Sequence, residues 1–368
     1  MEPEVSIVVP TYNERENVPV FVKELDKVMC EHNIPYELVI VDDNSPDGTA
    51  EVAKQQKPKC GKIKVIVRKN ERGLASAVIR GIKEASSKYV VVMDVDLQHP
   101  PSVVPKILEK LKEGYDVVVA SRYTKGGGIE NWSKVRLIIS KGATLLARIF
   151  VPKSSLTTDP MSGFFGIRKD VVEGVKLSPR GYKILLEILA KGKVKRVADV
   201  PYVFRNRYAG ESKLGTKVMM DYVLHLLKLA KETGELKRMI VFATIGLTGI
   251  VINEGVLYLS YEVLRLKELG YLGLAIAGLL GFEASVIYNF AMHERITFAD
   301  RIKDLKSSKL MRFVHYEIAS VSGLIIQLVF LLGLTAIGVN YLLANLIGII
   351  AGLAVRYSYS TTKAWGYS

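Results

Sequence analysis

The first two thirds of the chain alternate short apolar runs with segments of helical spacing. Runs the length of a buried strand occur at residues 5–10, 37–41, 63–67, 89–93 and 117–120. Apolar positions three and four apart, which indicate helices, occur at residues 17–31, 49–56, 73–86 and 102–111. Strands that alternate with helices through short connections predict an α/β fold with a doubly wound, mostly parallel sheet. Ligands bind such a sheet beyond the carboxyl ends of its strands.

Two further segments predict amphipathic helices that lie in a membrane interface. Residues 133–150 place Val135, Ile138 and Leu145 on one face, with lysines and arginines away from it. Residues 215–235 have the same character and lead into the apolar part of the chain. An ordinary surface helix packed on the sheet is the alternative for the first of these segments.

Beyond residue 236, long apolar runs replace the alternation. Runs about one bilayer long occupy residues 240–259, 270–290, 318–339 and 341–355, and the last can continue to residue 359. Glu254 and Glu283 interrupt these runs, and we expect them to face the bundle interior, preferably in interhelical hydrogen bonds. The domains expected are a catalytic domain at residues 1–214, an interfacial helix and linker at 215–236, and an all-α membrane domain with four transmembrane helices at 237–368.

Composition agrees with this division. The chain has 368 residues, 49% of them apolar, and a formal net charge of +14, which favours a membrane surface or phosphate ligands. No recognition motif supports nucleic acid as the partner. Cys30 and Cys60 lie in a charged, cytosol-like domain and form no CxxC, which argues against a disulfide or a metal role. The acidic N-terminus lacks the basic region of a signal peptide.

The distribution of lysine and arginine predicts the topology of a multi-pass cell-membrane protein. These residues are most frequent before the first apolar run and between the second and third, so we expect the catalytic domain and the C-terminus to be cytoplasmic. The residues concerned are Lys228, Lys231, Lys237, Arg238, Arg295, Arg301, Lys303, Lys306, Lys309 and Arg312.

Polar residues follow several of the predicted strands. Asp94 and Asp96 come one residue apart after a buried strand, where like charges are costly unless a cation lies between them. Carboxylates and the neighbouring Gln98 amide suit Mg²⁺ or Mn²⁺, although a solvated loop is the alternative for a lone DxD. The chain has neither GxGxxG nor GxxxxGK[ST] in this part, which disfavours a dinucleotide fold and a P-loop NTPase.

Six stretches in register resemble the GT-A glycosyltransferases of family 2, and most of all the dolichyl-phosphate mannosyltransferases. The stretches are PTYNE (10–14), VDDNSPDGT (41–49), NERGLASA (70–77), DVDLQHPP (94–101), ASRY (120–123) and DPMSGFFG (159–166). Ala75 departs from the family, which more often has glycine there. The apolar part resembles, more loosely, the small GtrA-type membrane domains.

The resemblance implies a donor site for a nucleotide-sugar, with GDP-mannose as the expected donor. It places Pro10, Tyr12, Glu14, Val41, Asp43, Asp94, Val95, Asp96, Gln98, Lys183, Arg207 and Lys213 in this site. Asp96 and Gln98 are the implied metal ligands, and Arg207 and Lys213 the implied diphosphate ligands. Glu14 has an alternative role as a helix-start charge. We favour turn roles for Asp42 and His99.

An acceptor site for dolichyl or other polyprenyl phosphate is expected beside the donor site. Arg136 and Ser140 are four residues apart on one helix and, with Arg122, can hold a lipid phosphate. Asp159 is either the general base or a residue that orients the metal or sugar, because a phosphate acceptor is already ionised. The expected reaction is metal-dependent, inverting mannosyl transfer. Another glycosyl donor, or a flippase for the lipid-linked sugar, is the alternative, and protein partners remain open.

Overall fold

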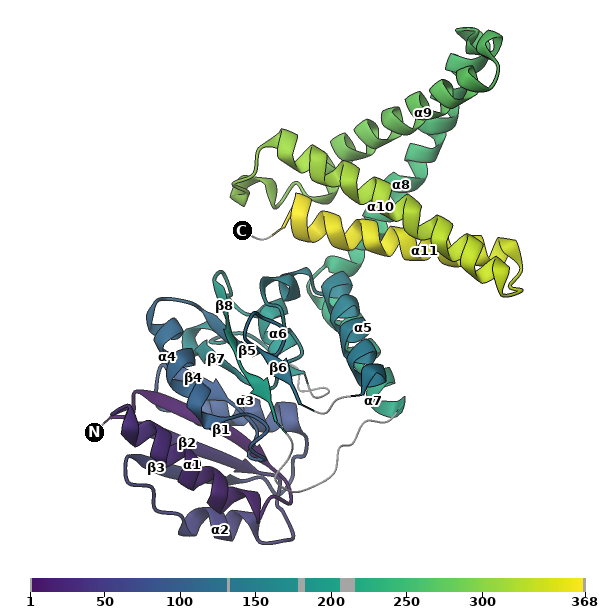
Figure 1. Cartoon of the computed structure of the whole chain (residues 1–368). Coiled ribbons are helices and arrows are strands. Elements are labelled where there is room, and N and C mark those ends of the chain that lie inside the picture. The colour runs from purple at the N-terminus through teal and green to yellow at the C-terminus, as the bar shows by residue number, and fades with distance from the viewer. Residues whose placement is uncertain (1, 131–132, 178–182, 206–215, 367–368) are drawn as a thin grey trace. The chain divides into compact units, whose positions relative to one another are not determined.

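The computed structural model describes residues 2–130, 133–177, 183–205 and 216–366, and the chain divides into two units (Figure 1). The first unit is Met1–Leu229 and the second is Ala230–Ser368. The first contains the strands and the second contains only helices and turns. Each unit is therefore described by itself.

A seven-stranded sheet forms the centre of the first unit, in the order β3-β2-β1-β4-β7-β5-β8. Only β7 runs antiparallel, between β4 and β5, which confirms the predicted mostly parallel sheet. A second, two-stranded sheet pairs β6 with β9. The strands are β1 Val5–Thr11, β2 Tyr36–Asp42, β3 Gly61–Val67, β4 Tyr89–Val92, β5 Val117–Ser121, β6 Gly128–Ile129, β7 Phe165–Arg168, β8 Val197–Pro201 and β9 Val203–Phe204.

Helices cover both faces of this sheet, as alternating burial along the strands requires. Ile7 of β1 packs with α1 and α4, and its neighbour Val8 packs with α3 and α6 on the other face. Both faces are thus apolar, and the polar residues gather at the strand ends. The helices are α1 Asn17–Glu31, α2 Thr49–Gln55, α3 Leu74–Glu84, α4 Val104–Lys112, α5 Lys134–Phe150, α6 Ile184–Lys191 and α7 Thr216–Glu232.

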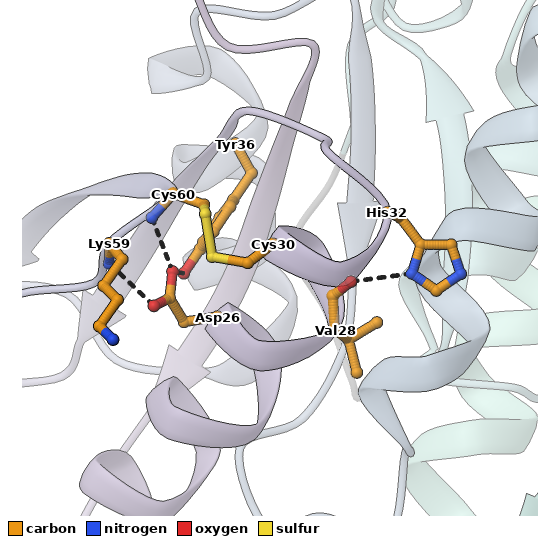
Figure 2. Close-up of a disulfide and its surroundings, with 7 residues drawn as sticks. All are labelled: Asp26, Val28, Cys30, His32, Tyr36, Lys59 and Cys60. Carbon is orange, nitrogen blue, oxygen red and sulfur yellow. Dashed lines mark hydrogen bonds between the residues drawn. A yellow bond between two sulfur atoms is a disulfide. The ribbon is translucent and has the colours of Figure 1, made fainter.

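A disulfide joins Cys30, at the end of α1, to Cys60, just before β3 (Figure 2). The expectation that these cysteines form no disulfide is therefore wrong. Their Cα atoms lie 5.5 Å apart, because α1 and β3 flank β2 and bring the two residues together. Asp26 accepts hydrogen bonds from the backbone N–H groups of Lys59 (2.8 Å) and Cys60 (3.0 Å), which holds the same corner together.

Helices α5 and α7 pack against each other and expose an apolar surface. The Tyr222 hydroxyl donates to the Ala143 carbonyl (2.7 Å), and Leu226 and Leu229 of α7 pack with Ala147 of α5. Val135 and Ile138 are 66% and 68% exposed, which a helix packed flat on the sheet would not show. The exposed apolar side chains, called here the interfacial face, are Val135, Ile138, Ile139, Leu145, Leu146, Met219, Met220, Val223, Leu224 and Leu227.

Four long helices make up the second unit, and each is long and apolar enough to cross a bilayer. The last runs to Tyr359, as the sequence allowed. Asn253 packs on α9 at Gly281, so Glu254, the next residue along α8, points away and is exposed. The expectation that Glu254 faces the bundle interior is therefore wrong, whereas Glu283 is half-buried. The helices are α8 Glu235–Tyr258, α9 Tyr271–Met292, α10 Lys309–Ala336 and α11 Tyr341–Tyr359.

Candidate active site

The loop that follows β4 carries Asp94, Asp96 and Gln98. Asp96 is buried (3% exposed) and accepts a hydrogen bond from the Gln98 backbone N–H (3.2 Å). The Asp94 side chain is 40% exposed. Leu97, between Asp96 and Gln98, has a φ of 61°, in the left-handed region, so the chain turns sharply here. The loop thus holds one carboxylate inside and presents the other toward solvent.

His99 fixes the start of this loop. Its Nδ1 accepts a hydrogen bond from the Asp94 backbone N–H (3.0 Å), and its ring stacks on Phe164 with centroids 5.2 Å apart. Tyr202 and Phe204 meet the ring edge-on. Burial lowers the pKa of His99 to about 4, so the ring is neutral at physiological pH. This supports the turn role expected of His99.

Gln98 is oriented by the chain that follows β9. Its Nε2 donates to the Arg205 carbonyl (3.1 Å), and the Arg205 N–H donates back to the Gln98 carbonyl (3.4 Å). These two bonds hold the Gln98 side chain and backbone against the segment after β9. A buried carboxylate with a neighbouring amide oxygen and a second carboxylate is a donor set that fits Mg²⁺ or Mn²⁺. Elsewhere in the described part of the chain, Asp26 lies close to the sulfurs of Cys30 and Cys60, but a disulfide offers no thiolate to a metal.

The ends of β1, β2 and β3 are organised by an ion pair that the sequence did not predict. Arg68, just after β3, donates from Nε to Asp43 (2.7 Å), and the Gly73 N–H donates to the other Asp43 oxygen (2.7 Å). Both groups of the pair are buried, so Asp43 holds the loop before α3 in place. Tyr12 is exposed by 40%, and the Arg72 guanidinium lies 5.7 Å from its ring centroid. In the sequence, this ion pair is indicated only by the position of Arg68 directly after the strand at residues 63–67.

The other expected donor-site residues lie around the ends of β1 and β2. Pro10 pairs with Val41 in the sheet, and the Val41 side chain is wholly buried in the core. Val95 is also buried. Glu14 precedes α1, and its carboxylate accepts from the Asn17 side-chain amide (2.5 Å), as a helix-start residue would. Asp42 accepts from the Ser45 N–H (2.9 Å), which confirms its turn role.

The fully buried carboxylate of Asp159 forms a salt bridge with Arg122, which follows β5. Asp159 is 0% exposed and accepts hydrogen bonds from Arg122 Nε (2.7 Å), Nη2 (2.8 Å) and backbone N–H (3.2 Å). Burial opposes the charge of Arg122, but the hydrogen bonds and charge of Asp159 outweigh it and raise the pKa of the guanidinium. Arg122 is therefore held in one orientation, with its charge partly balanced.

Ser140 lies beside this arginine, which joins α5 to the end of β5. The Tyr123 hydroxyl and Ser140 Oγ lie 2.8 Å apart, and the Arg122 guanidinium lies 5.4 Å from the Tyr123 ring centroid. Arg136, one turn before Ser140 on α5, is half-buried. Tyr123 thus links Arg122 to Ser140, and Arg136 lies on the same helix face as Ser140.

Lys183 adds a second cation on the other side of the Asp159 loop. Its Nζ donates to the Met161 carbonyl (3.0 Å). Burial, with a contribution from the positive charge of Arg122, lowers the pKa of Lys183 to about 8. Asp94 and Asp159 oppose this shift, so all four charged groups share one neighbourhood. Arg207 and Lys213, the expected diphosphate ligands, lie outside the described residues.

Asp199 of β8 supports the Asp159 loop and was missed from the sequence. Its carboxylate accepts from the Thr157 hydroxyl (2.5 Å), the Thr158 N–H (2.7 Å) and the Thr158 hydroxyl (2.6 Å). The Thr158 hydroxyl also contacts Ser121 Oγ (2.6 Å). Asp199 lies in a strand without a catalytic motif around it, so the sequence did not indicate that it supports the Asp159 loop.

Comparison with known proteins identifies the family. The profile of glycosyl transferase family 2 matches residues 6–175, and that of the GtrA/DPMS transmembrane domain matches residues 241–365. The dolichol-phosphate mannosyltransferase of Pyrococcus furiosus is 45% identical over 361 residues, which cover 98% of this chain and 99% of that protein. This chain belongs to the dolichol-phosphate mannosyltransferases. It is a glycosyltransferase and a multi-pass membrane protein.

Further relatives match the catalytic part of this mannosyltransferase family member. The dolichol-phosphate mannosyltransferase of Saccharomyces cerevisiae is 39% identical over 239 residues, covering 62% of this chain and 88% of that protein. Among solved structures, the glucosyl-3-phosphoglycerate synthase of Mycobacterium tuberculosis, in complex with Mn²⁺, UDP and glucosyl-3-phosphoglycerate, is 18% identical. That match has a TM-score of 0.47 and covers 62% of this chain and 80% of the other.

Proposed function

We propose that the protein transfers mannose from GDP-mannose to a dolichyl (polyprenyl) phosphate, with inversion, to give dolichyl phosphate mannose and GDP. The observation that carries this proposal is the Arg122–Asp159 pair, which Tyr123 links to Ser140, at the same edge of the sheet as Asp94 and Asp96. A cationic acceptor pocket next to an acidic donor loop suits a reaction in which one anion displaces another. The names of the relatives supply the sugar and the lipid.

The donor is assigned to the edge formed by β1, β2 and the loop after β4. Pro10, Tyr12 and Glu14 line the nucleobase and ribose pocket, and Asp43 keeps the adjoining loop in shape through Arg68. Asp96 and Gln98 would hold Mg²⁺ or Mn²⁺, which neutralises charge on the diphosphate. The further residues assigned to the donor are Val41, Asp94, Val95, Lys183, Arg207 and Lys213.

The acceptor phosphate is assigned to Arg122, Arg136 and Ser140. A phosphate monoester has a second pKa near 6, so its oxygen is largely ionised at neutral pH and needs no general base. Both oxygens of Asp159 are occupied by Arg122, which leaves Asp159 as the residue that positions this arginine. The phosphate oxygen bonds to the anomeric carbon while the bond from that carbon to the diphosphate oxygen breaks, and GDP leaves with the electron pair.

The interfacial face explains how the site meets a lipid acceptor. Ser140 and Arg136 lie on α5, the same helix that exposes Val135 and Ile138. Insertion of that face into the headgroup region places the acceptor residues at the depth of a lipid phosphate. We further propose that the catalytic domain, residues 1–214, and the C-terminus lie on the cytoplasmic side, as the positions of lysine and arginine favour.

Radiolabelled nucleotide-sugars and polyprenyl phosphates test the proposal, scored as label in the organic phase. We expect label only with GDP-mannose in the donor panel, and none with the Asp96→Ala variant, which keeps the fold. Asp170→Ala is the matched control, because Asp170 is an exposed aspartate that only pairs with Arg168 on the surface. Full activity of Asp96→Ala with added Mn²⁺ would contradict the metal assignment, and efficient transfer from another nucleotide-sugar would contradict the donor assignment.

A further inference from the structure

One end of the membrane unit gathers charged and aromatic side chains. The start of α8, the end of α9, the start of α10 and the end of α11 meet there, as hydrogen bonds from the Tyr357 hydroxyl to Glu235 (2.9 Å) and from Trp365 Nε1 to Glu294 (2.8 Å) show. We call this region the polar end. Its charges lie among packed rings, where desolvation makes each uncompensated charge expensive.

Three arginines of the polar end each have a carboxylate partner. Arg301 donates to Glu235 (2.6 Å) and Arg238 donates twice to Asp300 (2.8 Å each). Arg312 donates to Glu294 through Nε (2.7 Å) and Nη2 (3.0 Å). These three arginines are matched by the three carboxylates Glu235, Asp300 and Glu294.

Arg356 is a fourth arginine in the polar end, and it has no such partner among the described residues. It lies on α11, inside the candidate span Tyr341–Ala364, and is half-buried. Its Nε is buried and makes no hydrogen bond. Gly323 of α10 makes room for it, since a Cβ there would lie 3.3 Å from Nε and 3.5 Å from Nη2. Among the described residues, Arg356 thus lacks the carboxylate partner that Arg238, Arg301 and Arg312 each have.

A buried histidine directly after α9 lies close enough to Arg356 for the charge of the arginine to act on its ring. His293 is 0% exposed, its ring stacks on Phe242 with centroids 4.2 Å apart, and its Nδ1 bonds to Thr297 Oγ1 (2.9 Å). Its Nε2 is buried and has no hydrogen-bond partner, and the charge of Arg356 acts on this ring. Ser360, one turn beyond Arg356, also has a buried hydroxyl without a partner. Arg356, His293 and Ser360 thus each have a buried polar atom that makes no hydrogen bond within the described part of the chain.

We propose that Arg356, with His293 and Ser360, binds the phosphate group of a membrane lipid. The guanidinium fork fits two phosphate oxygens, and the imidazole and hydroxyl can donate to others. Arg356 lies in the last part of the candidate span Tyr341–Ala364, and its long side chain can extend toward the headgroup region. This site lies in the membrane unit and is independent of the proposed transferase chemistry. An anionic phospholipid and polyprenyl phosphate offer the same phosphate chemistry.

The test compares full-length wild type with Arg356→Gln after delipidation in neutral detergent. Phosphatidylglycerol, polyprenyl phosphate, phosphatidylcholine and inorganic phosphate are titrated separately, with bound lipid counted by native mass spectrometry and unfolding followed by temperature. We expect Arg356→Gln to weaken phosphatidylglycerol or polyprenyl phosphate binding by about tenfold or more. Without lipid, Arg356→Gln should unfold at the same or a higher temperature, because an uncompensated charge has been removed.

Arg295→Gln is the matched control. Arg295 is two residues from His293 but is exposed, so its removal changes the charge of the same region without touching the site. Arg356→Lys keeps the positive charge but lacks the planar guanidinium that can bind two phosphate oxygens, so it should retain part of the binding. Equal anionic-lipid binding by wild type and Arg356→Gln, or an equal loss in Arg295→Gln, would overturn the proposal. An effect of inorganic phosphate as large as that of lipid would overturn the assignment to a membrane lipid.

Discussion

The lowered pKa of Lys183 makes a prediction about the pH dependence of the enzyme. Lys183 is kept near pKa 8 by burial and by Arg122, well below the usual 10.5 of a lysine. In the proposed donor site, only the protonated amine attracts a diphosphate. Binding should therefore weaken as pH rises through the pKa of the free enzyme, which the pH dependence of kcat/KM reports.

The magnitude follows from the pKa. With a pKa of about 8, the protonated fraction is roughly 0.9 at pH 7, 0.5 at pH 8 and 0.09 at pH 9. We expect kcat/KM for GDP-mannose to fall about tenfold between pH 7 and pH 9, relative to a variant that cannot titrate at this position. Arginine at position 183 keeps its charge throughout this range and should remove this part of the fall.

The assay measures initial rates of organic-phase label at several pH values for wild type, Lys183→Met and Lys183→Arg. Dividing the wild-type profile by that of Lys183→Met cancels the titration of the nucleotide and of other groups. The ratio should fall through pH 8, whereas the ratio of Lys183→Arg to Lys183→Met should stay level. Parallel profiles for wild type and Lys183→Met would refute the reasoning, because they would show that the Lys183 charge does not act on the donor.

Three further variants test the structure around the site. Replacing Cys30 and Cys60 by serine should lower the free energy of unfolding by about 3.6 kcal/mol under non-reducing conditions, measured by denaturation, because the bond closes a loop with a sequence separation of 30. Asp159→Asn should destabilise the protein by about 3–5 kcal/mol and raise the KM for the lipid acceptor, because it leaves the buried Arg122 charge without its partner. Ile138→Glu should weaken transfer to acceptor presented in vesicles far more than transfer to acceptor in detergent, since it places a charge on the interfacial face.

Each of these expectations has a control and a contradicting outcome. The serine variant should be as stable as reduced wild type, which is the control. If it were also as stable as oxidised wild type, that result would contradict the disulfide. Asp170→Asn removes a surface carboxylate and should cost at most about 1 kcal/mol, so an equal loss in Asp159→Asn would argue against a buried pair. Equal rates for Ile138→Glu in vesicles and in detergent would remove the interfacial role of α5.

The amino-acid sequence determined the elements and their order. Short apolar runs and period-3.6 apolar patterns mark most strands and helices of the first unit, and four long apolar runs mark the membrane helices. These patterns suffice because burial of one face is a local property of each segment. The strand-end motifs likewise located Asp94, Asp96 and Arg122 at one edge, since parallel strands end together.

Tertiary structure alone decided which side chains partner which. Nothing near Cys30 in the sequence points to Cys60, and only the placement of α1 and β3 on either side of β2 brings them together. Arg68 and Asp199 are ordinary charged residues until the sheet sets them against Asp43 and the threonines before Asp159. Periodicity reports how a residue faces its own element, whereas an ion pair depends on the distance between elements. That distance exists only once the chain has folded.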